Sequence, residues 1–171
     1  EIKKWSNYTV HNAWQKEPDW NFDINVVNYE SLHKYSQSYS LHNKVRLLIV
    51  DESIMVKNLR GGKGKRSKRA QHVFYIAGEA DRTWLLSGAP AAKDASDLFG
   101  QFRIMYPNIF TSFWRFAERH CVIEKNVWNS RGNYGGTILG TKRGIDLRSR
   151  FRDIMFMRNM DEVAGFLPEY I

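Results

Sequence analysis

Two adjacent carboxylates, Asp51 and Glu52, are the residues of this sequence best placed to do chemistry. They directly follow an unbroken apolar run, residues 47–50, of the kind that forms a strand buried on both faces of a parallel sheet. Ligands of open α/β sheets bind outside the carboxyl ends of the strands, where phosphate-transferring ATPases use an acidic residue to hold Mg²⁺. The pair therefore predicts a site for a cation and a reacting group. Taken alone, it leaves open that the acids merely cap the next helix or accept hydrogen bonds from loop amides.

A sharp turn, Ser87-Gly88-Ala89-Pro90, ends a second predicted strand. This strand covers residues 82–88, and residues 67–80 before it have the apolar spacing of a helix. Strand, helix and strand in this order predict a βαβ unit, which has parallel strands and a right-handed crossover. If the two strands are neighbours, Ser87 lies near Asp51. By itself the four-residue sequence indicates only a turn.

A basic, glycine-rich loop is predicted over residues 59–69, directly after the strand that carries the acids. Seven positive charges and no acid fall within residues 57–69: Lys57, Arg60, Lys63, Lys65, Arg66, Lys68 and Arg69. The glycines within it disfavour a helix. Such a loop can follow a phosphate backbone without reading bases, and the alternative is a solvated surface loop. The phosphate-cradling pattern Gly-x-x-x-x-Gly-Lys-Ser/Thr is absent from the sequence.

The overall composition is that of a folded, basic chain. Its 171 residues suffice for one domain with a core, and 26 Lys and Arg against 18 Asp and Glu give a net charge of +8. This excess favours a polyanionic partner, nucleic acid ahead of a membrane surface. No apolar run reaches the length of a membrane span, and the single cysteine, Cys121, cannot form an internal disulfide.

The remaining elements alternate strands with helices, which predicts a mixed α/β fold. Their apolar and aromatic stripes have helical spacing and are expected to form core. The expected elements are a helix end within 1–20, a strand over 23–29, a helix over 30–39, helices over 94–106 and 110–120, a loop or hairpin over 130–140, a short basic helix over 146–152, an apolar strand or extended piece over 154–157 and a last helix opened by Asn159 and Glu162.

The order of these segments resembles the Swi/Snf-type helicase-like ATPases of helicase superfamily 2, especially their small phage and bacterial members. The resemblance is collinear over about residues 25–170. It is carried by NVVNYESL (25–32), LLIVDES (47–53, similar to the DExx box or motif II), KN (57–58), KRSKRA (65–70), RTWLLSGAP (82–90, similar to motif III), DLFGQFRIMYPNIFTSFWRFAERHC (97–121) and FRDIMFMRNMDEVAGFLPEY (151–170).

The resemblance implies a partial RecA-like lobe, a three-layer α/β fold with a parallel sheet. Residues 1–171 would be the later part of the first lobe, from motif II to its end. The phosphate loop would precede residue 1 and the second lobe would follow residue 171. Neither ATP nor Mg²⁺ would then be fully bound by these residues alone, and we expect them alone not to hydrolyse ATP.

The resemblance also implies roles for individual residues. Asp51 would hold Mg²⁺ through water, and Glu52 would orient or deprotonate the attacking water. Ser87 to Pro90 would couple nucleotide state to the nucleic-acid face. The DNA backbone would be bound without base specificity by Lys57, Asn58, Arg60, Lys63, Lys65, Arg66, Lys68 and Arg69. The second lobe and the upstream phosphate-loop segment would be further partners. The implied location is the cytoplasm of a bacterial host cell, where the gene could belong to a phage, or the nucleus of a eukaryote.

The sequence departs from the family pattern at several positions. Ser53-Ile54 replaces the usual Ala-His, so the histidine that would link the ATP site to motif III is absent. Ser87 and Ala89 replace the threonines of the motif III turn, Ala91-Ala92 replace polar residues, and Asn159-Met160 replace commoner Arg or Thr and Lys. These departures bear on the efficiency of coupling more than on the fold. Two alternatives remain: a non-catalytic nucleic-acid-binding α/β module and a structural α/β domain whose charge serves solubility.

Overall fold

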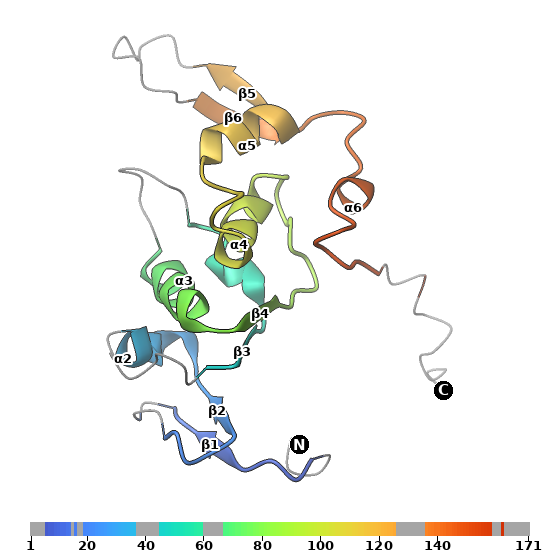
Figure 1. The fold of residues 1–171 in the computed structure, drawn as a ribbon. Helices are drawn as coiled ribbons and strands as arrows, with labels where there is room; N and C mark the ends of the chain where they lie inside the picture. The colour runs from blue at the N-terminus through green and yellow to red at the C-terminus, as the bar shows by residue number, and fades with distance from the viewer. Residues whose placement is uncertain are drawn as a thin grey trace, which may run out of the picture.

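The computed structural model describes residues 6–14, 16, 19–36, 45–59, 67–125, 136–158 and 162. Figure 1 shows an elongated arrangement that runs from β1 and β2 at one end to β5 and β6 at the other. The strands are β1 (Val10–Asn12), β2 (Ile24–Val26), β3 (Leu47–Val50), β4 (Arg82–Leu85), β5 (Cys121–Lys125) and β6 (Gly136–Thr141). The helices are α2 (Leu32–Ser36), α3 (Lys68–Glu79), α4 (Asp97–Met105), α5 (Phe113–His120) and α6 (Leu147–Arg150), with 3₁₀ turns η1 (Tyr29–Ser31) and η3 (Ser53–Val56).

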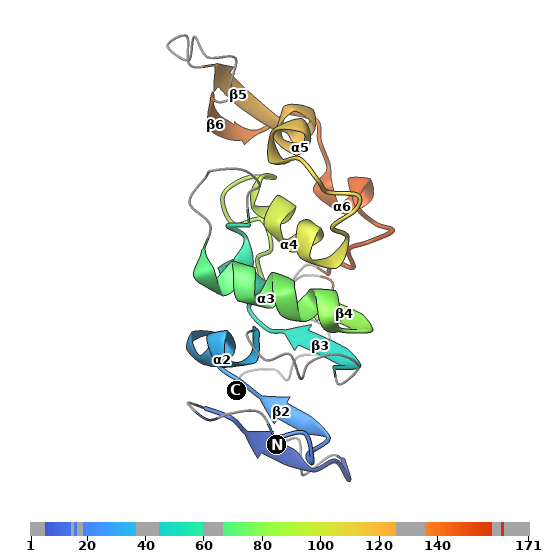
Figure 2. The ribbon, with the colours of Figure 1, turned by 60° about the vertical axis from the view of Figure 1, so that its left-hand side comes forward.

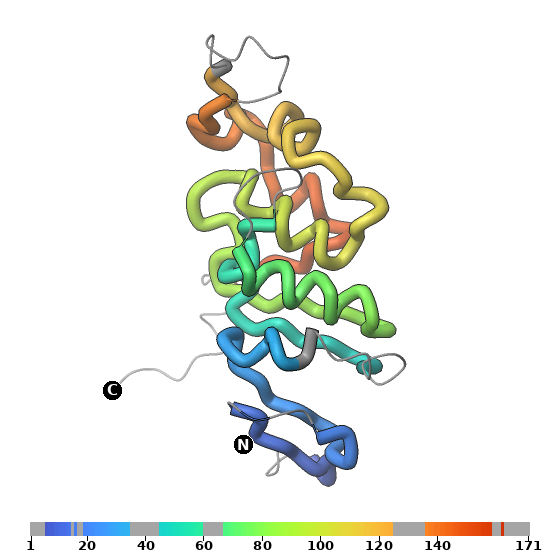
Figure 3. Tube along the Cα trace, turned by 90° about the vertical axis from the view of Figure 1, so that its left-hand side faces the viewer, coloured from blue at the N-terminus to red at the C-terminus, as the bar shows by residue number. Residues whose placement is uncertain are grey.

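The predicted βαβ unit is confirmed as β3, α3 and β4. The two strands pair in parallel, with Leu47 opposite Arg82 and Val50 opposite Leu85. The apolar face of α3 buries Val73 and Ile76 in a cluster that also contains Val50. Figures 2 and 3 show α2, α3 and α4 following one another along the length of the molecule. The spacing of apolar residues in the sequence therefore predicted the location of this βαβ unit correctly.

The expected burial of β3 on both faces is wrong for the described part of the chain. Val50 is 5% exposed, whereas Leu47 and Ile49 are 41% and 52% exposed. Trp84, opposite Ile49 on β4, is 55% exposed. Leu48, Val50 and Leu85 alternate with these residues and pack into the cluster beneath the sheet. Alternation is the physical reason, because successive strand residues point to opposite faces and only one face has packed cover here.

A second core is aromatic and lies between α4, α5 and the segment that follows α6. Its buried rings are Phe99, Phe102, Phe113, Phe116 and Phe151. The rings of Phe102 and Phe151 are 4.7 Å apart between centroids. Ile104 of α4 belongs instead to the cluster beneath β3, so α4 contributes to both cores. This confirms that the aromatic stripes of the sequence are core.

Several expected boundaries change. The chain before residue 20 contains β1, which the sequence analysis missed, and the strand expected over 23–29 is the short β2, paired in parallel with β1. Lys68 and Arg69, assigned to the basic loop, open α3. The loop or hairpin over 130–140 is in part an antiparallel strand, β6 on β5. Residues 155–158 are in no strand, and the expected cap at Asn159 lies outside the described residues. Among the helices described, none has the length and apolarity to cross a membrane.

Candidate nucleotide and coupling site

Asp51 and Glu52 lie at the carboxyl end of β3, as predicted, and both side chains are exposed. The backbone N–H of Glu52 donates to Asp51 Oδ1 over 2.9 Å. Glu52 itself has φ 49° and ψ 49°, the left-handed region that few residues other than glycine adopt. This conformation turns the chain sharply from the strand into η3, so the two carboxylates sit at the corner of that turn.

Tyr29 holds this corner from the side. Its hydroxyl donates to the carbonyl oxygen of Asp51 over 2.6 Å. Burial raises the pKa of the Tyr29 phenol to about 12, so the proton it donates is retained at neutral pH. The guanidinium of Arg69 lies 5.2 Å from the centre of the Tyr29 ring and pairs with Glu30 over 2.9 Å. Tyr29 was not predicted as a site residue, although it lies within NVVNYESL (25–32), one of the segments that carry the resemblance.

The predicted proximity of the acids and the Ser87 turn is confirmed. The Leu86 N–H donates to the Val50 carbonyl over 2.9 Å, and the Ser53 N–H donates to the Leu86 carbonyl over 2.8 Å. These two bonds continue the β3–β4 ladder beyond the strands. Within the turn, the Ala89 N–H donates to Ser87 Oγ over 3.3 Å. The chemical roles of these residues are taken up below as proposals.

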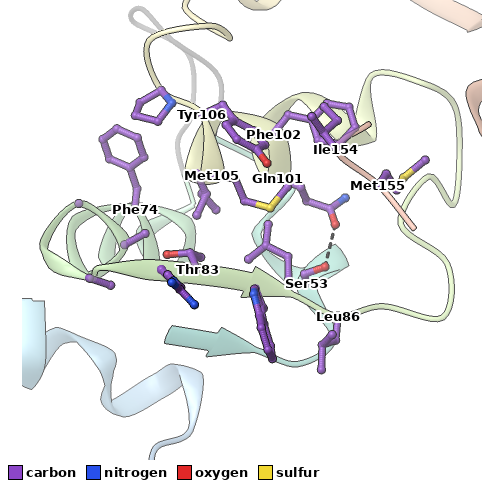
Figure 4. A pocket seen from close by; sticks show the side chains of 18 of the residues that line it. Ser53, Phe74, Thr83, Leu86, Gln101, Phe102, Met105, Tyr106, Ile154 and Met155 are labelled. Carbon is purple, nitrogen blue, oxygen red and sulfur yellow. Dashed lines mark hydrogen bonds between the residues drawn. The ribbon is translucent and has the colours of Figure 1, made fainter. Parts of the chain in front are cut away.

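A hydrogen-bond chain through α4 joins the two segments a second time (Figure 4). Ser53 Oγ donates to Gln101 Oε1 over 2.7 Å, and Gln101 Nε2 donates to the Pro90 carbonyl over 2.6 Å. Both side chains are buried, Ser53 at 1% and Gln101 at 3% exposure. No sequence signal marked Gln101, because it lies within a mainly apolar helix 48 residues from Ser53.

The face of α4 that carries Gln101 also packs directly against η3. A Cβ at Gly100 would overlap the backbone of Lys57, so only glycine allows this approach. Lys57 Nζ pairs with Asp97 Oδ2 over 3.1 Å, and the Lys93 N–H donates to the same oxygen over 3.0 Å. The Asp97 side chain is only 10% exposed. The 3₁₀ turn η3, which directly follows the acids, is thus held at both ends by α4.

The predicted nucleic-acid residues have different environments. Lys57 and Arg69 have carboxylate partners inside the protein, which are Asp97 and Glu30. Asn58 and Lys68 are exposed at either end of the segment that leads into α3. Four others, Arg60, Lys63, Lys65 and Arg66, lie outside the described residues. The structure therefore shows Asn58 and Lys68 exposed, and Lys57 and Arg69 engaged in ion pairs within the chain.

A cavity of about 1040 Å³ lies beside this network, between α3, β4, α4 and the segment around Ile154. Figure 4 shows Phe74, Thr83, Met105 and Ile154 at its walls, with Gln101 directed toward Ser53. Asp51 and Glu52 are not among its lining residues. The cavity therefore reaches the residue after the acids, Ser53, while the two carboxylates are not part of its lining.

The acidic corner can be tested for its fit to Mg²⁺. Among the described residues, no group of three or more His, Cys, Asp or Glu side chains is placed to hold a metal ion. Mg²⁺ does not need one, because it keeps several waters and is held by one or two carboxylates together with substrate phosphates. The exposed carboxylate of Asp51 fits such water-mediated binding. Direct coordination by a protein cage does not fit.

Comparison with known proteins agrees with this geometry. The family model described as the SNF2-related domain matches residues 3–169. The SWI/SNF-related matrix-associated actin-dependent regulator of chromatin subfamily A-like protein 1 homolog of Caenorhabditis elegans is 31% identical over 153 residues, which cover 86% of this chain and 20% of the relative. The corresponding protein of Xenopus laevis is 27% identical, over 85% of this chain and 14% of its own.

A second kind of relative is the DNA annealing helicase and endonuclease ZRANB3 of Mus musculus. It is 28% identical over 123 residues, which cover 72% of this chain and 11% of that protein. The chain thus spans a fifth or less of the length of these three relatives.

Proposed function

Because the chain belongs to the SNF2-related domain family, we propose that it is part of an ATP-dependent DNA translocase or helicase. Within that protein it would form the later part of the first RecA-like lobe, from motif II to the end of the lobe. The observation that carries the proposal is the acidic corner of β3, which lies beside the Ser87 turn of β4 through the bonds of Ser53 and Leu86. Parallel strands with this juxtaposition are what a nucleotide-sensing edge requires.

In this site Asp51 would bind the water shell of Mg²⁺, and Glu52 would orient the attacking water or accept its proton. Bound Mg²⁺ would neutralise charge on the phosphates of ATP, the substrate. The contribution of the chain is then positioning, because Glu52 would place the attacking water opposite the bond that breaks at the γ-phosphate. The triphosphate cradle would come from another part of the longer protein, since the phosphate-loop pattern is absent here. These 171 residues alone would therefore lack ATPase activity.

The DNA side of the site would use Asn58 and Lys68, which are exposed, together with Arg60, Lys63, Lys65 and Arg66, which lie outside the described residues. Phosphate contacts there would be sequence-independent and sensitive to salt. The exposed face of β3 and β4, with Leu47, Ile49 and Trp84, supports further packing partners within the longer protein. We propose the upstream phosphate-loop segment and the second lobe as these partners. A protein that moves on DNA would be located with the DNA. We therefore propose the cytoplasm of a bacterial host cell, where the gene could belong to a phage, or the nucleus of a eukaryote.

The test is the Glu52→Gln variant of the full-length protein. We expect DNA-stimulated ATP turnover to fall by about 10²-fold or more, with nucleotide affinity retained, because the amide keeps the shape of the side chain and loses the base. The matched control is Glu118→Gln, which removes an exposed carboxylate on α5. Turnover and binding of a fluorescent nucleotide are measured in parallel. Normal turnover of Glu52→Gln would remove Glu52 from this role.

The alternative is a nucleic-acid-binding module without catalysis. It is favoured by the net charge of +8 and the absence of the phosphate-loop pattern. A full-length protein that binds DNA in a salt-dependent manner and shows no ATP turnover would support this alternative.

A further inference from the structure

The second connection between the acidic corner and the Ser87 turn, which is made by side chains, depends on Gln101. A buried primary amide is costly unless its donors and acceptor are paired. Gln101 Nε2 donates to two carbonyl oxygens, those of Pro90 over 2.6 Å and Asp97 over 3.1 Å. Since both partners accept, the amide nitrogen must face them, and Oε1 is left for the hydroxyl of Ser53. The orientation of Gln101 is therefore fixed by its surroundings.

The helix that carries Gln101 is also fixed against both segments. Asp97, Gly100 and Gln101 have the i, i+3, i+4 spacing that places them on one face of α4. On this face Asp97 pairs with Lys57, and Gly100 lies against the Lys57 backbone. A shift of the acidic corner through Ser53 must then either move Gln101 or break a buried hydrogen bond. The same holds for a shift of Pro90.

We propose that Gln101 is a positioning residue that couples the state of the acidic corner to the Ser87–Pro90 turn. It acts through Ser53 on one side and the Pro90 carbonyl on the other, and it touches neither ATP nor Mg²⁺. In the family, a histidine shortly after Asp-Glu is expected to make this link. Ile54 occupies that position here and cannot form a hydrogen bond through its side chain. Gln101 links the two segments without that histidine. The inference rests on the proposed function.

The experiment measures ATP turnover of the full-length protein with and without DNA. Gln101→Ala removes both ends of the chain, and Ser53→Ala removes one hydroxyl and leaves the packing nearly intact. For each we expect unchanged KM for ATP, unchanged DNA-free turnover and a loss of DNA stimulation of about tenfold. In the double variant the loss should equal that of Gln101→Ala alone, because both side chains act through one chain. Gln71→Ala on α3 is the matched control and should behave as wild type.

Melting curves of every variant separate coupling from folding, and Ser53→Ala keeps the test open if Gln101→Ala folds poorly. Full DNA stimulation in Ser53→Ala and in a folded Gln101→Ala would overturn the proposal, as would losses that add in the double variant. Neither outcome would affect the proposed function, which fails only if the wild-type protein shows no turnover or Glu52→Gln turns over normally. If the wild-type protein shows no ATP turnover, the proposed role of Gln101 in coupling is overturned as well.

Discussion

At the scale of single residues, the corner at Asp51 and Glu52 is held by its neighbours. A left-handed backbone at a residue such as Glu52 is unfavourable and persists only where surrounding contacts impose it. Here the Ser53 N–H is bound by Leu86, and the Asp51 carbonyl is bound by the hydroxyl of Tyr29. The carboxylates themselves stay exposed. The protein thus fixes the backbone and leaves the reactive groups open.

Tyr29→Phe tests this anchor, since it removes the hydroxyl and keeps the ring. We expect the free energy of unfolding to fall by about 1 kcal/mol at neutral pH. The pKa of Tyr29 is raised to about 12 from an unfolded value of 10.0, so the unfolded chain releases the proton first. Wild-type stability from this group is therefore complete below pH 10 and is lost as the pH rises toward 12. Urea unfolding followed by tryptophan fluorescence measures both effects.

The variant should lack this alkaline loss of stability. Tyr75→Phe is the matched control, because Tyr75 is 59% exposed and its substitution should change neither quantity. An unchanged alkaline profile in Tyr29→Phe would show that Tyr29 does not retain its proton on folding.

At the scale of elements, the close approach of α4 to η3 allows the long-range contacts of the site to form. Lys57 and Asp97 are 40 residues apart in the chain, and Ser53 and Gln101 are 48 apart. Both pairs form because Gly100 lets the helix come within contact of the Lys57 backbone. A bulkier residue there would move the whole face of α4 outward. The two hydrogen-bonded pairs would then lengthen together.

Two helical glycines make a matched test of this contact. Gly78→Ala in α3 should raise the free energy of unfolding by about 0.5–1 kcal/mol, because a Cβ there meets nothing within 4 Å and alanine favours the helix. Gly100→Ala in α4 gains the same propensity and should still lower stability by about 1–3 kcal/mol, because the methyl group overlaps the Lys57 backbone. Thermal unfolding of both variants checks the opposite signs. Stabilisation by Gly100→Ala would contradict the close approach.

At the scale of the whole molecule, the positive charge is divided between internal and external roles. Lys57 is committed to a largely buried carboxylate, and Arg69 stacks over Tyr29 and pairs with Glu30. Lys68 is exposed at the start of α3. Net charge alone therefore overstates the number of residues that are ready to meet a phosphate backbone.

Salt dependence of DNA binding by the full-length protein separates the two roles. Lys68→Ala should reduce the slope of log affinity against log salt by about 1, the value for one lost phosphate contact. Lys57→Ala should leave the slope unchanged and lower stability by about 2 kcal/mol, because the Asp97 carboxylate loses its partner. Filter binding over a salt series, with melting curves, measures both. An equal fall in slope for Lys57→Ala would show that its ammonium leaves Asp97 to bind DNA.

The sequence by itself determined the acids at the end of β3, the βαβ unit and the helices α4 and α5, because these depend on local periodicity and on the general geometry of parallel strands. It also indicated the basic segment and the aromatic core. Only the tertiary structure decided that Tyr29 anchors Asp51, that Gln101 joins Ser53 to Pro90, and that Lys57 pairs with Asp97. It likewise decided that Leu47 and Ile49, on one face of β3, are exposed. These contacts join residues far apart in the chain, and their formation depends on how closely packed helices approach one another, which no local pattern of residue types encodes.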